Sequence, residues 1–186
     1  SCGIADLTWR RGFKAEANRI ALRVREKMGL SAVCPIDPIK VCAHFDIELI
    51  KLSEIAPHSP FLLRESSKFS AVTVPVGLRT GIVHNDSHHP HRQRSNICHE
   101  LAHCFLGHKC PPPLTSEGER IYDGSIEAEA NFLAGTLLLT NEGAWDILYR
   151  QLITEAQHIY GISEKMLNFR LRVSGAHIRY RRFGAY

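Results

Sequence analysis

The sequence lacks any long apolar run. The densest apolar stretch, Leu133 to Leu139, is far shorter than the roughly 20 residues that a membrane-spanning helix needs. The first residues show no basic-then-apolar pattern of the kind found in secretory signal peptides. We therefore expect a cytoplasmic protein without membrane contact.

The sequence also lacks a C-x-x-C pair. Its cysteines are scattered singly along the chain, at Cys2, Cys34, Cys42, Cys98, Cys104 and Cys110. In an intracellular protein of this size this usage predicts reduced thiols rather than a disulfide framework. Cys98, Cys104 and Cys110 flank a histidine motif, so thiolate ligation of a metal is a minor alternative to their role as small core side chains.

Internal repeats and low-complexity tracts are absent too, and 186 residues fit one domain with a helical appendage. The net charge of +4 is unevenly spread, since residues 163–186 carry six Lys or Arg against one acid. Basic ends can bind nucleic acid or an acidic partner. No nucleic-acid-binding motif accompanies the basic residues, so direct nucleic-acid binding is not expected. Solvated helix faces explain the positive charge more simply.

What the sequence does contain is Cys98-His99-Glu100-Leu101-Ala102-His103, which has the pattern H-E-x-x-H. On a helix, His99 and His103 project from one face and can bind one metal ion. Glu100 is then in the position of the general base of a zinc hydrolase. The alternative is an ordinary amphipathic helix with two surface histidines, so the motif needs a third ligand.

Hydrophobic periodicity and breakers predict the elements around this motif. Helices are predicted over 13–28, 38–44, 92–108, 125–139, 141–152 and 163–173, with Thr140 and Ser163 as caps and a final segment after Gly175. Strands are predicted over 47–52, 69–76 and 80–84, with Pro75 suggesting an edge position. Residues 53–67 and 85–91 are expected to be loops, and the histidines of the 88–91 stretch are assigned to a polar connector rather than to a site.

These elements predict an α+β fold. It is mostly helical, with a small antiparallel sheet beside the H-E-x-x-H helix and a C-terminal helical segment. We assign residues 1–152 to the core that carries the motif, with an N-terminal helix, the sheet, the motif helix and a third-ligand helix. Residues 153–186 form a basic helical extension.

Two positions compete for the third ligand. His108 is nine residues after His99, whereas metzincins place a third His ten after the first and a Gly seven after it. Lys109 and Leu106 occupy those positions here. His108 is better explained as the end of the helix, where a cation favours the carbonyl terminus.

Glu127 lies near the start of the next long helix, and a second antiparallel helix is how gluzincins complete such a site. Asn131, one turn later, could bond the outer nitrogen of a ligand histidine and fix its tautomer. Glu129 is the competing acid, but it faces elsewhere and leaves Asn131 without that role. Both acids could instead merely favour a helix N-terminus.

Two stretches, R-S-N-I-C-H-E-L-A-H-C-F-L-G-H and I-E-A-E-A-N-F-L-A-G-T-L-L-L, resemble the paired motifs of the ImmA/IrrE-type zinc metallopeptidases. W-R-R-G-F-K-A-E-A-N-R-I-A near the N-terminus and Y-G-I-S-E-K-M-L-N-F-R-L near the C-terminus are also similar to that group. Thr140 departs from the family, which commonly has Pro there. The resemblance implies Zn²⁺ as the cofactor, His99, His103 and Glu127 as its ligands, and Glu100 as the base.

The resemblance further implies a regulatory, site-specific endopeptidase that cleaves a DNA-binding transcriptional repressor with a helix-turn-helix domain. A rival from another class is a zinc-binding regulator that sequesters its partner without cleaving it. Glu100 favours the enzyme, because a pure binder has no need of a base. A nucleic-acid-binding module that uses the basic ends is a third possibility, and it predicts steep salt dependence of DNA binding.

The oxyanion-stabilising donor has three candidates, Tyr122, His84 and His177, which the sequence does not rank. An edge strand at 79–84 is expected to bind extended substrate by β-addition.

Overall fold

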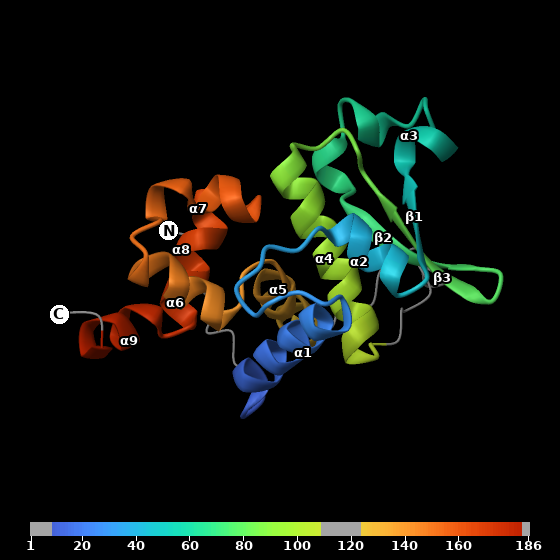
Figure 1. The fold of residues 1–186 in the computed structure, drawn as a ribbon. Coiled ribbons are helices and arrows are strands. Elements are labelled where there is room, and N and C mark those ends of the chain that lie inside the picture. Colours follow the sequence, from blue (N-terminus) through green and yellow to red (C-terminus); the bar gives the residue numbers. More distant parts are fainter. Residues whose placement is uncertain (1–8, 109–123, 184–186) are drawn as a thin grey trace.

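The computed structural model describes residues 9–108 and 124–183 of the chain (Figure 1). Helices dominate, as the sequence predicts: α1 (Phe13–Lys27), α2 (Pro38–His44), α3 (Leu52–Ile55), η1 (Pro60–Leu62), η2 (Ser66–Lys68), α4 (Pro90–Leu106), α5 (Gly124–Leu138), α6 (Asn141–Tyr149), α7 (Ile153–Tyr160), α8 (Glu164–Val173) and α9 (Ala176–Phe183). The strands are β1 (Ile47–Lys51), β2 (Ala71–Val76) and β3 (Arg79–His84). The α+β fold class is confirmed.

The sheet is mixed, and the prediction of an antiparallel sheet was wrong in this respect. The strand order is β1-β3-β2, with β1 parallel to β3 and β2 antiparallel to β3. A tight turn at Gly77, which has φ 61°, makes β2 and β3 a hairpin. The connection from residue 52 to residue 70 starts and ends at the same end of the sheet, where Lys51 and Ala71 both pair with His84. Strand β2 therefore runs back against β1, and after the hairpin β3 runs in the direction of β1.

The edge prediction for residues 79–84 was also wrong, because β3 is the central strand. Its last four residues are buried, as expected for a strand covered on both faces. β2 is an edge strand, as Pro75 suggested, since proline cannot donate to a neighbouring strand. Gly81 lets the strands pack closely, because a Cβ there would lie 2.6 Å from Val76 Cγ2.

Helices α4 and α5 pack side by side, and α4 lies against the sheet (Figure 1). Helix α4 begins with Pro90 at its first turn, where the missing N–H costs nothing, and it ends at Gly107 in the left-handed conformation with φ 66°. It buries Ile97, Cys98, Leu101 and Ala102 and leaves His99 and His103 partly exposed. The apolar side thus fixes the direction in which the histidines point.

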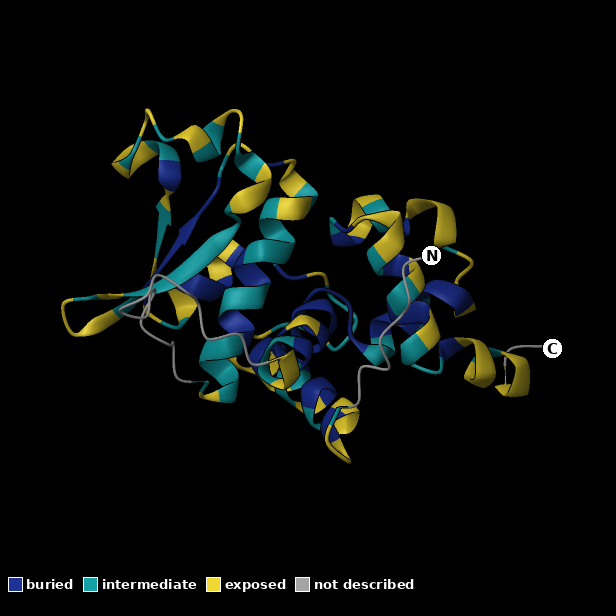
Figure 2. Cartoon of the chain, turned by 180° about the vertical axis from the view of Figure 1, so that it is seen from behind, coloured by how far each residue is buried: buried dark blue, intermediate teal, exposed yellow. Residues whose placement is uncertain are grey.

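Helix α5 is the centre of the core. Nine of its residues are buried, and it packs against α1, α4 and α8. The buried cluster is continuous from α1 through α4 and α5 to the C-terminal helices. Figure 2 shows this dark band running through the middle of the molecule, with exposed residues toward α3 and α9.

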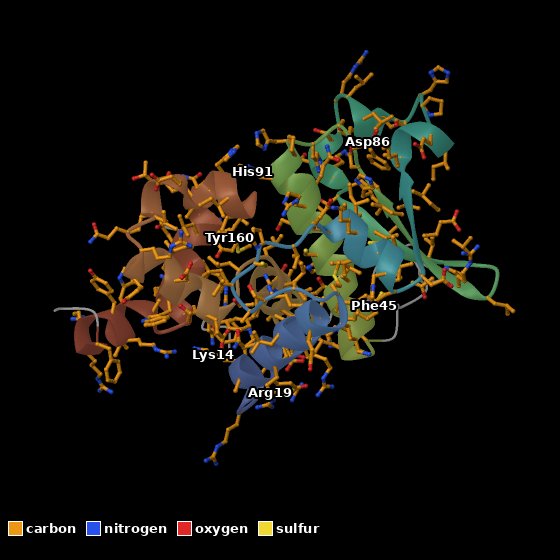
Figure 3. The ribbon with its side chains drawn as sticks, in the orientation of Figure 1. Lys14, Arg19, Phe45, Asp86, His91 and Tyr160 are labelled. Carbon is orange, nitrogen blue, oxygen red and sulfur yellow. The ribbon has the colours of Figure 1, made fainter. Side chains whose placement is uncertain are left out.

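The C-terminal helices are held by caps and by buried polar contacts. The predicted caps are confirmed, since Thr140 Oγ1 accepts from Gly143 N at 2.9 Å and Ser163 Oγ accepts from Met166 N at 3.2 Å. Tyr160, labelled in Figure 3, donates to the Val33 carbonyl at 2.8 Å. Helix α7 was not delimited from the sequence, and the domain boundary at residue 152 stays a prediction.

Arg94 connects the motif helix to the C-terminal helices. Its guanidinium donates to the carbonyls of Ile36 at 2.6 Å, Gly161 at 3.2 Å and Tyr160 at 3.3 Å. One side chain of α4 thereby donates hydrogen bonds to three backbone carbonyls outside that helix. Within the residues that the structure describes, no helix combines the length and apolar character needed to cross a membrane.

Candidate metal centre

Two histidines of α4 converge one helical turn apart. His99 Nε2 and His103 Nε2 lie 3.0 Å from each other, and the ring planes are inclined at 81°. Because residues four apart lie on one face of a helix, the fold of α4 alone is enough to bring these two nitrogens together.

Glu127, in the first turn of α5, completes a group of three. Its Oε2 is 3.2 Å from His99 Nε2, and its Oε1 is 3.4 Å from His103 Nε2. Among the described residues these three form the one group of His, Cys, Asp or Glu with ligand atoms close enough for a metal ion, all within 4.8 Å of one another. Glu129 does not belong to this group.

The group fits zinc. Zinc–nitrogen and zinc–oxygen bonds of about 2.1 Å at tetrahedral angles separate neighbouring ligand atoms by about 3.4 Å, close to the spacings found here. Two imidazoles and one carboxylate are the donor set of catalytic zinc sites that keep a fourth position open. The side chains of His99, His103 and Glu127 are 22%, 13% and 30% exposed, so the group is reachable from solvent.

Each ligand histidine has a partner at its outer nitrogen. Asn131 Oδ1 lies 2.9 Å from His99 Nδ1, so the His99 ring donates there and keeps its Nε2 lone pair for a metal. His108 Nδ1 lies 3.0 Å from His103 Nδ1. The role proposed for Asn131 from the sequence stays a prediction, but the contact that it requires is present.

His108 and Glu129 lie behind His103, on the side away from the metal-binding nitrogen. His108 Nε2 is 3.8 Å from Glu129 Oε2, and Glu129 Oε1 accepts from Arg10 Nε at 3.0 Å. Sequence reasoning rejected His108 as a ligand and missed that it meets the outer nitrogen of one. Its five-residue distance from His103, just past the Gly107 turn, was the available signal.

Burial, followed by the charge of His99, lowers the pKa of His103. A histidine with a lowered pKa is neutral near pH 7, which is the form that binds a metal. Cys98 points to the other side of α4, and burial raises its pKa to about 12. A thiol that resists ionisation is a poor ligand, and Cys98 lies in the core. Cys110 lies outside the described residues.

Glu100 is held by the sheet. Thr73 Oγ1, on the edge strand β2, donates to Glu100 Oε2 at 2.7 Å. This bond occupies one carboxylate oxygen and leaves the other available for a proton. The sequence offered no signal for Thr73, because nothing in a strand pattern tells which helix residue its side chain meets.

None of the three candidates for the oxyanion donor is placed at the metal-binding group by the residues that the structure describes. Tyr122 falls outside the described residues. His84 is buried at the end of β3, where burial lowers its pKa, and none of its interactions in the described part of the chain involves the three ligands. His177 is on α9, which packs against α6 and α8 and lies at the opposite end of Figure 1 from the sheet.

The loop at 88–91 anchors the start of α4. His88 is buried, with Nε2 2.7 Å from the Ser66 carbonyl and Nδ1 3.1 Å from Asn96 Nδ2. His89 caps the helix by accepting from His91 N at 3.2 Å. These contacts connect α4 to the segment around η2 and account for two of the histidines structurally.

Comparison with known proteins agrees with this geometry. Residues 43–172, more than half of the chain, match the family described as the IrrE N-terminal-like domain, a peptidase family. No curated protein matches the sequence. The matched range contains α4, α5 and all three residues of the metal-binding group. The chain therefore belongs to the ImmA/IrrE family of metallopeptidases.

Proposed function

We propose that the chain is a zinc-dependent endopeptidase that cuts a DNA-binding transcriptional repressor at one site. The observation that supports it best is the convergence of His99, His103 and Glu127 beside Glu100. A pure metal store has no need of an oriented carboxylate next to the first ligand. Family membership supports the peptidase class, and the repressor as substrate is part of the proposal.

His99, His103 and Glu127 would hold the zinc ion. When bound, zinc supplies Lewis acidity that activates a water and polarises the scissile carbonyl. Glu100 takes a proton from the attacking water through its second carboxylate oxygen and delivers it to the leaving amine. Thr73 keeps the carboxylate in place during both transfers.

The edge strand β2 is where we place the substrate. One side of β2 pairs with β3 and the other has no strand partner among the described residues. Because Thr73 of this strand contacts Glu100, a peptide added along the free side runs close to the base. Binding as an extended strand requires a flexible or locally unfolded segment in the target.

The experiment mixes the zinc-loaded protein with the repressor that is encoded beside its gene and follows cleavage of the repressor. One discrete cut is expected, and Glu100→Gln should retain zinc and lose cutting, because the amide cannot accept the proton. Uncut repressor held in a stable complex with the wild type would support sequestration instead. Cutting by Glu100→Gln at the wild-type rate would contradict the mechanism.

A further inference from the structure

A patch of aromatic and arginine side chains lies on helices α6 and α9. We call Trp145, Tyr149, Arg179, Arg182 and Phe183 the α6–α9 patch. The rings of Trp145 and Tyr149 stack with centroids 5.3 Å apart and planes at 24°. The Arg179 guanidinium carbon lies 4.5 Å from the centre of the Trp145 ring, so a cation covers the stacked aromatic pair.

The patch is open to solvent. Tyr149 is 59% exposed and Phe183 is 66% exposed, although both are large and apolar. Arg182 and Phe183 are three and four residues after Arg179, so the three share one side of α9. In Figure 2 exposed residues cover the outer part of α9, where it projects from the body of the molecule. Exposed apolar side chains that gather around aromatic and arginine residues mark protein-binding surfaces.

The charge around the patch is positive. Helix α9 contains three arginines and no acid, and no Asp or Glu follows Glu164 in the sequence. The nearby acid on α6, Asp146, is 3.5 Å from Arg150 Nη1 and is partly neutralised by it. Carboxylates on a partner protein therefore favour its binding to this patch.

We propose that the α6–α9 patch docks a segment of a partner protein that carries both carboxylates and apolar side chains. The carboxylates pair with Arg179 and Arg182, and the apolar side chains cover Tyr149 and Phe183. Duplex nucleic acid would pair its phosphates with the arginines, but its stacked bases would leave Tyr149 and Phe183 uncovered. A protein segment uses both halves of the patch.

The patch is remote from the metal-binding group. The two lie on different helices, and Figure 1 shows α9 at the opposite end of the molecule from the sheet that contacts Glu100. A docked segment therefore leaves the metal group accessible. That the docked protein is also the protein that is cut rests on the proposed function.

The test is binding of a fluorescein-labelled peptide in which glutamates alternate with leucine and phenylalanine. Titration uses the full chain with Glu100→Gln, so that the probe stays intact, and follows fluorescence anisotropy. Arg179→Gln with Arg182→Gln should weaken binding by about tenfold or more, and Phe183→Ser by about fivefold. These side chains are exposed, so the variants should fold normally.

The matched control is Arg19→Gln with Arg23→Gln on α1, which removes the same charge from another exposed surface (Figure 3 labels Arg19). It should bind the peptide like the parent. Equal weakening by both double variants would overturn the proposal, because net charge alone would then explain binding.

Two further probes separate the alternatives. A glutamine analogue of the peptide should lose binding, and retained binding would contradict the role of charge. A duplex DNA fragment, and a single-stranded oligonucleotide whose bases could stack on Tyr149 and Phe183, should both bind more weakly than the peptide. DNA binding that depends on Arg179 and Arg182, without peptide binding, would overturn the proposal. None of these measurements involves cutting, so their failure leaves the proposed peptidase function standing.

Discussion

Replacing Thr73 by Val isolates the contact between the edge strand and Glu100. Valine keeps the shape and the strand preference of threonine and removes only the hydroxyl that donates to Glu100 Oε2 at 2.7 Å. Helix α4 and the three metal-binding side chains do not depend on this bond. The change therefore affects the position of the base and little else.

The magnitude follows from the bond. A hydrogen bond to a charged group contributes about 1.5–3 kcal/mol. A barrier increase of about 1.4 kcal/mol slows a reaction tenfold, so losing this bond should lower kcat by about tenfold to a hundredfold. Zinc content should stay at the wild-type level.

The assay measures the initial rate of repressor cutting at saturating substrate, together with zinc content after dialysis. Thr80→Val is the matched control, since Thr80 lies on the neighbouring strand β3, where it pairs with Ile47 and Pro75, and the hydroxyl that bonds Glu100 is that of Thr73. It should cut normally. Wild-type kcat in Thr73→Val would refute the reasoning, and so would loss of zinc, which would show that Thr73 acts on the metal site and not on the base.

Three further changes test the metal group and the sheet. Glu127→Ala should lose far more zinc affinity than Glu129→Ala in a competition titration with a chelator, because only Glu127 meets both histidine Nε2 atoms; the reverse order would sink the ligand assignment. Asn131→Ala should weaken zinc binding by about 10-fold to 100-fold with the fold intact, and unchanged affinity would show that its contact with the ligand histidine is idle. Gly81→Ala should lower the free energy of unfolding by about 1–3 kcal/mol in a urea titration, because its Cβ would lie 2.6 Å from Val76 Cγ2; unchanged stability would mean that β2 shifts freely.

Both histidine ligands were predictable because their spacing is local. His99 and His103 are one turn apart, and any helix over this stretch brings them together. The end of α4 was nearly as clear, since Gly107 stops the helix. Its start was predicted two residues late, at residue 92, because Pro90 was assigned to the preceding loop. The Thr140 and Ser163 caps were also predictable, since in each a side chain bonds a backbone group three residues away.

The residues that contact the site from other parts of the chain were harder to predict. His108 meets His103 because the chain turns at Gly107. The spacing from His99 that argued against His108 as a third ligand says nothing about this contact. Thr73 meets Glu100 across 27 positions of sequence. Such contacts depend on how β2 packs on α4, and side-chain periodicity does not encode the offset between two packed elements.

The sheet shows the same limit. Three strands were expected from β-branched residues and turns, and Pro75 pointed to an edge. Strand order is a global property, however, and it depends on where the segment from residue 52 to residue 70 takes the chain. An antiparallel sheet with residues 79–84 at its edge fits the local pattern equally well.

The sequence by itself thus determined the α+β class, the motif helix and the two histidines that share its face, because each follows from interactions within a few residues. The sequence also favoured Glu127 over Glu129 as the third ligand. Only the tertiary structure decided that β3 is central, that both carboxylate oxygens of Glu127 lie beside histidine Nε2 atoms, and that Thr73 holds Glu100. The physical reason is that these features are set by packing between elements distant in sequence, where small differences in angle and register choose the partner.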